Sequence, residues 1–124
     1  MKDGKKTMVK AVRGAIQLEA DTPEDIHQAT CTLFDVMLKR NKIESEQIIS
    51  LIISQTDDLH SYNPATALRQ HGVDGFALFC LQELKIDRQL PRTIRFLMHI
   101  TCEEGKSLDY VYLGGAKNLR PDLC

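Results

Sequence analysis

Motifs for the common kinds of covalent and metal chemistry are absent from this sequence of 124 residues. It contains no Gly-rich phosphate loop and no serine in a nucleophile elbow. Its four cysteines form no CxxC pair, and its four histidines show no ligand spacing with them, so a zinc site is not expected. No apolar run approaches the roughly 20 residues that span a bilayer. These absences leave little support for metal-dependent or nucleophilic chemistry.

A strong charge of either sign is also missing. The net charge of −1 provides no basic field for nucleic acid or a membrane surface. Residues 1–7, MKDGKKT, are basic but precede no long apolar stretch, so they do not match a secretory signal and we expect a flexible tail. Residues 8–124 suit one domain with a single core. Cys31 and Cys102 fit small, reduced apolar residues of a cytoplasmic protein.

Residues 93–102 combine an apolar strand pattern with a charge. Arg95 lies on the mixed side of this expected strand, while every residue on the other side is apolar. A guanidinium cannot be neutralised and is rarely buried without a partner. Arg95 therefore either pairs with a carboxylate of its own protein or lines an anion site, and composition alone favours the ion pair. The apolar side consists of Ile94, Phe96, Met98, Ile100 and Cys102.

A second arginine raises the same question. Arg13 lies inside an expected apolar strand at residues 8–18, and Gly14 beside it would let another backbone or a ligand come close. A structural ion pair is again the simpler interpretation. Two strands that each present one inward arginine nevertheless favour a common anion site more than either strand does alone.

Helix signals occur twice. Residues 22–40 have Thr22 as N-cap, Pro23 at the first helical position and apolar residues at three- and four-residue spacing, and Asn41 is predicted to form the left-handed C-cap. A shorter helix is predicted to start at Asn63-Pro64 and to end near Gly72. Both helices are interpreted as packing on a sheet.

The remaining strands complete the expected order β-α-β-α-β-β-β. Residues 48–55 form a nearly continuous apolar run, which predicts a central strand covered on both faces. Two further strands are expected at residues 76–81 and 108–113, and Asp57 and Asp58 are interpreted as solvated loop charges. The order indicates an α+β fold, a mixed β-sheet with two helices packed on one face. The face without helices is often buried by self-association in a small protein.

Several guanidinium groups fall in the ordered segments, together with one carboxylate, one phenol and one thiol. Such cationic forks suit a small substrate that carries two carboxylates and a hydroxyl. They also suit chemistry that needs charge stabilisation and positioning but no covalent step. The residues of this constellation are Arg13, Arg69, Arg95, Arg120, Tyr112, Glu83 and Cys80.

From about residue 8 onward, the chain resembles the small trimeric chorismate mutases of the mixed α+β class. The resemblance implies the unimolecular Claisen rearrangement of chorismate to prephenate, without a cofactor, in phenylalanine and tyrosine biosynthesis. It also implies a homotrimer shaped as a pseudo-barrel, with active sites between subunits. The matching pieces are VRGAIQLEADT (12–22), TDDLHSYNPATALR (56–69), CLQE (80–83), IRFLM (94–98), YVYL (110–113) and LRPDL (119–123).

The resemblance assigns roles to five residues of the constellation. Arg95 would donate to the ether oxygen, where negative charge grows as the C–O bond breaks ahead of C–C bond formation. Arg13 and Tyr112 would hold the side-chain carboxylate of the substrate. Glu83 and Cys80 would contact the ring hydroxyl end. Because a cysteine and a glutamate three apart face opposite sides of a regular strand, the chain must bend after Cys80 if both serve one site.

The remaining implied contacts come from a helix and from the end of the chain. Arg69 would reach the site from a neighbouring subunit, Ala65 would bind substrate, and Leu119 and Arg120 would belong to a tail that helps to close the site. Two positions depart from the family. Asn63 stands where an aromatic residue is usual, and Thr66 stands where some relatives have a lysine, which affects the contacts that close over the substrate.

Two alternatives stay open beside the mutase. A trimer of similar shape, such as an enamine/imine deaminase-like protein that binds a small carboxylate, would need an interface arginine but not the set of Cys80, Glu83 and Tyr112. An interaction domain would pair its arginines internally, and the strands supply few acidic partners for that. The mutase is the preferred interpretation.

Overall fold

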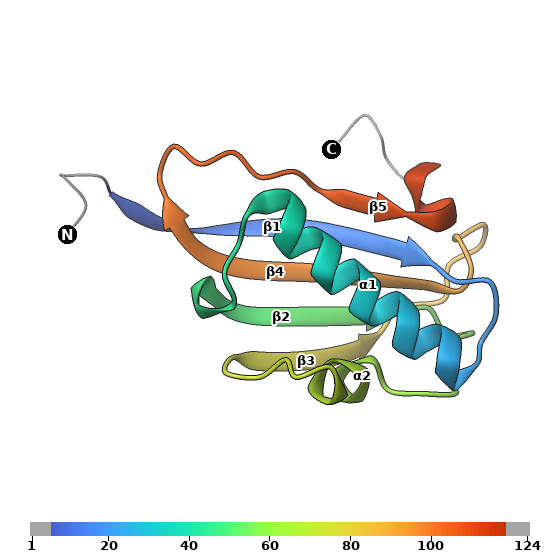
Figure 1. Ribbon diagram of the computed structural model, residues 1–124. Helices are drawn as coiled ribbons and strands as arrows, with labels where there is room; N and C mark the ends of the chain where they lie inside the picture. The colour runs from blue at the N-terminus through green and yellow to red at the C-terminus, as the bar shows by residue number, and fades with distance from the viewer. Residues whose placement is uncertain (1–5, 119–124) are drawn as a thin grey trace.

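A mixed β-sheet is the central element of the computed structural model, which describes residues 6–118. The strand order is β3-β2-β4-β1-β5, with β4 antiparallel to both β1 and β2, and with the outer strands β3 and β5 parallel to their neighbours (Figure 1). This arrangement confirms the expected α+β class and the expected order of elements. The strands are β1 (Thr7–Gln17), β2 (Ile48–Gln55), β3 (Ala77–Gln82), β4 (Thr93–Glu103) and β5 (Val111–Leu113).

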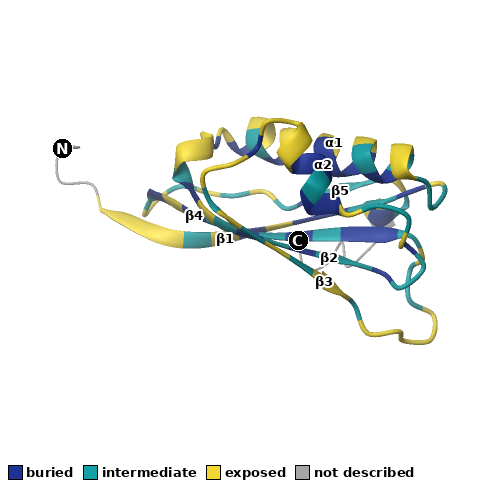
Figure 2. Ribbon diagram, turned by 90° about the horizontal axis from the view of Figure 1, so that it is seen from below, coloured by how far each residue is buried: buried dark blue, intermediate teal, exposed yellow. Residues whose placement is uncertain are grey.

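The helices α1 (Pro23–Asn41) and α2 (Pro64–Gln70) lie on one face of this sheet, as predicted (Figure 2). Thr22 caps α1 by accepting a hydrogen bond from the backbone of Asp25 at 3.0 Å, as its N-cap position requires. Two short 3-10 helices, η1 (Ser45–Gln47) and η2 (Gly114–Asn118), precede β2 and follow β5.

Asn41 does not form the left-handed C-cap of α1, so that prediction is wrong. The left-handed residue is Lys42, with φ 53°. Asn41 is the last helical residue, and its side chain donates to the backbone oxygen of Asp109 at 3.0 Å and accepts from the Asp109 N–H at 2.6 Å. These bonds satisfy the backbone N–H and C=O of Asp109 in place of a strand partner. The last strand accordingly spans Val111–Leu113 and not 108–113.

The core lies between the sheet and the two helices. The apolar side of β4 is buried from Ile94 to Cys102, which confirms the predicted alternation. Along β2, Leu51 and Ile53 are fully buried under the helices, but Ile49 is 44% exposed. The prediction that this strand is covered on both faces is therefore wrong for a single chain, because the chain places no second layer there.

The face without helices, called the open face below, carries several large apolar side chains. Strand register places Val9, Phe79 and Leu81 on it, because they lie opposite Thr101, Ile52 and Ser54, which also point to this side. These three apolar residues are between 45% and 61% exposed. Several exposed large apolar side chains on one face favour an interaction surface over a solvated one.

The close approach expected at Gly14 is made by α1. A Cβ added at Gly14 would lie 2.5 Å from the Sδ of Met37 and 3.2 Å from the Cδ1 of Leu33, and both of these side chains are fully buried. Gly14 thus allows β1 and α1 to pack closely, on the side of the sheet away from Arg13.

Replacing Gly14 by alanine should destabilise the fold. The added methyl group overpacks a filled core, so Gly14→Ala should lower the free energy of unfolding by about 1–3 kcal/mol. Denaturant unfolding at a fixed protein concentration measures this loss. Gly105→Ala is the matched control, since its Cβ would meet nothing within 4 Å. Equal stability of the two variants would contradict the close packing.

Candidate active site

An ion pair on the open face joins the middle of β4 to the end of β3. The Nε of Arg95 donates to Oε2 of Glu83 at 2.8 Å, and the two side chains are 29% and 18% exposed. Glu83 directly follows β3, and its backbone N–H donates to the oxygen of Gln55 at 2.8 Å, which holds it beside the end of β2. Because both side chains are partly buried, solvent screens the attraction between them less than it screens a salt bridge at the surface.

The strand pattern left open whether Arg95 pairs with a carboxylate of its own protein or lines an anion site. Its Nε meets a carboxylate of its own chain, which is the internal ion pair that composition alone favoured. Among residues 6–118, no acceptor is bonded to the two terminal amino groups of Arg95. A guanidinium carries five N–H donors in a planar fork, so one bond at Nε leaves four donors available. Arg95 is thus internally paired and still able to bind an anion.

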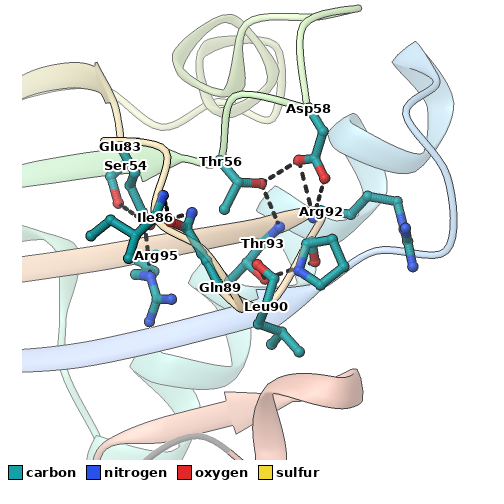
Figure 3. A network of polar contacts seen from close by, with 11 residues as sticks. Ser54, Thr56, Asp58, Glu83, Ile86, Gln89, Leu90, Arg92, Thr93 and Arg95 are labelled. Atoms are coloured by element: carbon teal, nitrogen blue, oxygen red, sulfur yellow. Dashed lines mark hydrogen bonds and ion pairs between the residues drawn. The ribbon is translucent and has the colours of Figure 1, made fainter.

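Glu83 receives two further hydrogen bonds (Figure 3). The hydroxyl of Ser54 donates to the same Oε2 at 2.6 Å, and the amide of Gln89 lies 3.5 Å from Oε1. The Ser54 bond is short, as is typical of a hydroxyl that donates to an ionised carboxylate. Neither partner was predicted from the sequence. The available signal for Ser54 was its place as a polar interruption in the apolar run of β2.

A pocket of about 380 Å³ opens beside this ion pair. It brings together Arg13 and Arg95, whose strands β1 and β4 are paired with Ala15 opposite Arg95. Tyr112 lies opposite Ala15 in the parallel pairing of β1 with β5, so it faces the same side of the sheet. The lining residues are Arg13, Ile52, Ser54, Arg95, Phe96 and Leu97.

Arg13 contributes an exposed charge to this pocket. Its guanidinium carbon lies 6.0 Å from the centre of the Tyr110 ring, at the limit of a cation–π contact. Two guanidinium groups thus line one pocket of the open face, and the Glu83 carboxylate is bonded to one of them, Arg95. This arrangement can bind a small dianion and stabilise negative charge that develops on it.

A second group of predicted site residues lies on the helix side of the sheet. Cys80 is opposite the buried Ile53, and its thiol donates to Oδ1 of Asn63 at 3.6 Å. Burial raises the pKa of the Cys80 thiol, although the backbone N–H of Ala65 and the charge of Arg69 act in the opposite direction. The thiol is therefore neutral at neutral pH and serves as a weak donor.

The bend expected after Cys80 does not occur. The parallel ladder between β2 and β3 runs without interruption to the pair Gln55 and Gln82, so β3 keeps its alternation. Cys80 consequently faces α2 with Ala65 and Arg69, whereas the carboxylate of Glu83 reaches the open face. A single chain does not bring Cys80 and Glu83 to one site, and the reason is the regular pairing of β3 with β2.

Other predictions for the site differ in outcome. Asp58 is not a solvated loop charge, because both of its carboxylate oxygens accept from the N–H of Arg92, at 3.0 and 3.1 Å (Figure 3). Leu119 and Arg120 lie outside the described residues.

Within residues 6–118, no group of three His, Cys, Asp or Glu side chains could hold a metal ion. In the same range, no helix has the length and apolarity needed to cross a membrane.

Comparison with known proteins agrees with the resemblance found in the sequence. The family described as Chorismate mutase type I matches residues 9–123. The chain belongs to this family. Membership confirms the predicted family and enzyme class. It does not support the deaminase-like alternative. The two arginines and the carboxylate of the open face are thus found in a protein of the chorismate mutase family.

Individual relatives of this chorismate mutase family member cover almost its whole length. It is 44% identical to Chorismate mutase AroH of Thermus thermophilus over 118 residues, which cover 94% of this chain and 97% of that protein. It is 33% identical to Chorismate mutase AroH of Bacillus subtilis (strain 168), over 94% and 93% of the two chains. A solved chorismate mutase from Clostridium thermocellum superposes with a TM-score of 0.82 at 37% identity, over 87% of this chain and 97% of that one.

Asn63 holds the start of α2, which carries the second group of site residues. Its Oδ1 accepts from the backbone of Ala65 at 2.8 Å and of Thr66 at 3.4 Å. Asn63→Ala removes this cap and should lower the free energy of unfolding by about 1 kcal/mol, while Asn63→Asp, which keeps the acceptor, should not. Urea unfolding at one protein concentration measures both. Wild-type stability of the alanine variant would contradict a capping role.

Proposed function

We propose that this chain converts chorismate to prephenate, a step of aromatic amino acid biosynthesis, at the pocket of the open face. The observation that carries the proposal is the Arg95 guanidinium, which is bonded at Nε by Glu83 and lines the same pocket as Arg13. The reaction is intramolecular, and the proposed mechanism assigns no step to a metal or cofactor. The free thiols of Cys31, Cys80 and Cys102 support placing the enzyme in the cytoplasm.

Charge development explains the proposed role of Arg95. Breaking of the C–O ether bond runs ahead of C–C bond formation, so negative charge grows on the ether oxygen in the transition state. The terminal N–H groups of Arg95 donate to this oxygen and stabilise the transition state more than the ground state. Because Glu83 already holds the guanidinium, little reorganisation is needed at the moment of reaction.

The other residues of the open face bind and shape the substrate. Arg13 and Tyr112 hold the side-chain carboxylate, which restrains the substrate in its compact, reactive conformer and removes an entropic cost. Glu83 contacts the ring hydroxyl end, and its negative charge favours the ring as it becomes electron-poor. Leu119 and Arg120 belong to the segment that closes the site.

The complete site is proposed to form between two chains of a homotrimer. Cys80, Ala65 and Arg69 lie on the helix side of β3, and Arg95 lies on the open face, so the sheet of one chain separates the two groups. One substrate can meet both groups only when the second comes from a neighbouring subunit. The exposed apolar side chains of the open face support this association. Cys80 and Ala65 thereby join Arg69 as contributions of the neighbour.

Turnover of chorismate tests the proposed activity directly. Purified, chelator-treated protein should consume chorismate in a spectrophotometric assay, and Arg95→Ala should lower kcat at least about 100-fold, by analogy with the loss of one oxyanion donor. Arg88→Ala is the matched control, because Arg88 is exposed in the loop between β3 and β4 and does not line the pocket. An inactive wild type would refute the activity, and a near-wild-type kcat for Arg95→Ala would refute the role of Arg95.

Mixed trimers test the shared site. Arg69→Ala and Arg95→Ala subunits should each be inactive alone, because each removes one side of every site. After equal mixing and subunit exchange, activity should recover to about a quarter of the wild-type value, since random pairing leaves that fraction of sites with both arginines. Tagged subunits separated by affinity chromatography confirm the exchange. No recovery in exchanged trimers would place Arg69 and Arg95 in one chain's site.

A further inference from the structure

We propose that Ser54 is a positioning residue that holds the Glu83 carboxylate and thereby aims the Arg95 guanidinium into the pocket. The inference rests on the proposed function, since it concerns how the same site is organised before the substrate arrives. Ser54 lies on β2 directly opposite Arg95 of β4, so the two side chains are neighbours on the open face. Both donate to one atom, Oε2 of Glu83, at 2.6 and 2.8 Å (Figure 3).

Glu83 needs a fixed donor because of where it lies in the chain. It opens the loop 83–92, and its next neighbours include Leu84, which is 81% exposed, and Ile86, which is 63% exposed. This loop provides little packing to restrain the carboxylate. Gln89, the partner contributed by the loop, lies 3.5 Å from Oε1, at the limit of a hydrogen bond. Ser54 instead donates from an inner strand of the sheet, at a distance of 2.6 Å.

Holding Oε2 determines which way Arg95 points. A guanidinium is a rigid plane, so a bond at Nε sets the directions of the four terminal N–H groups. If Glu83 were free to change rotamer, Arg95 would follow it or lose its partner, and the donors would no longer meet the ether oxygen. Misplacement of a preorganised donor costs catalysis, even when the donor itself is present. The other oxygen, Oε1, accepts neither of these two bonds and lies 3.5 Å from the amide of Gln89.

Ser54 also lines the pocket, so direct contact with substrate is the competing explanation. The two explanations differ in their dependence on Glu83. A positioning residue loses its effect once Glu83 is removed, because there is no carboxylate left to hold. A residue that touches the substrate keeps its effect in the same background.

Steady-state kinetics of the wild type and four variants separates these explanations. Ser54→Ala should lower kcat about tenfold, the effect of losing one hydrogen bond to a charged group, with a smaller change in KM. Ser54→Thr, which keeps the hydroxyl, should restore most of kcat. In a Glu83→Ala background, Ser54→Ala should change kcat by less than about twofold. A tenfold loss that persists in that background, or no loss in the wild-type background, would overturn the proposal.

Ser50→Ala is the matched control variant. Ser50 lies on the same strand and the same face, is likewise half-buried, and has its hydroxyl 3.3 Å from Nδ1 of His99 rather than near Glu83. Its replacement should leave kcat close to wild type. Equal losses of kcat in Ser50→Ala and Ser54→Ala would indicate a general effect on β2 and would overturn the proposal.

A second measurement does not depend on turnover. In the ¹H–¹⁵N spectrum of the ligand-free protein, the Arg95 Nε–H signal should exchange slowly with solvent in the wild type and in Ser50→Ala. It should exchange faster in Ser54→Ala, because the acceptor Glu83 is no longer held. Unchanged exchange in Ser54→Ala would overturn the positioning role. Failure of the positioning role would not affect the result of the chorismate assay. Conversely, an inactive wild type would refute the proposed activity without changing the measured exchange of the Arg95 Nε–H. The two proposals can therefore fail separately.

Discussion

The ion pair between Arg95 and Glu83 is the constraint on which the rest of the site depends. A half-buried guanidinium is always charged, and removing its carboxylate would leave an uncompensated charge beside the core. Because Arg95 is on β4 and Glu83 follows β3, the pair spans β2, which lies between those two strands. Ser54 supplies the bridge from β2 itself. Three strands therefore determine the direction of one guanidinium.

The loop between β3 and β4 is anchored at both ends by this part of the structure. Glu83 is held at its start, and Arg92 at its end adopts a left-handed backbone with φ 49° while its N–H donates to Asp58. A left-handed arginine is uncommon and persists when its surroundings over-determine it. Arg92 lies three residues before Arg95, so the carboxylate of Asp58 fixes how the chain enters β4. The exposed middle of the loop contributes little to either anchor.

The two faces of the sheet have different tasks in one chain. The face under α1 and α2 buries the core, and it also carries Cys80 beside the start of α2. The open face carries the charges of Arg13, Glu83 and Arg95 among exposed apolar side chains. The alternating side chains of β3 point to both faces of the sheet, and because β3 is an edge strand they do so at the margin of the sheet. A second chain placed against the open face would cover apolar surface and could complete a site with the same contact.

The sequence by itself determined the features that depend on near neighbours. Thr22 and Pro23 start α1, alternation buries one side of β4, and ordered short pieces identify the family. It did not determine that Arg95 pairs with Glu83, that Lys42 and not Asn41 takes the left-handed cap, or that Asp58 binds Arg92. Those outcomes depend on contacts between segments brought together by strand register and helix packing. Capping and periodicity act within a few residues, whereas the partner of a half-buried charge is decided only when distant strands lie side by side.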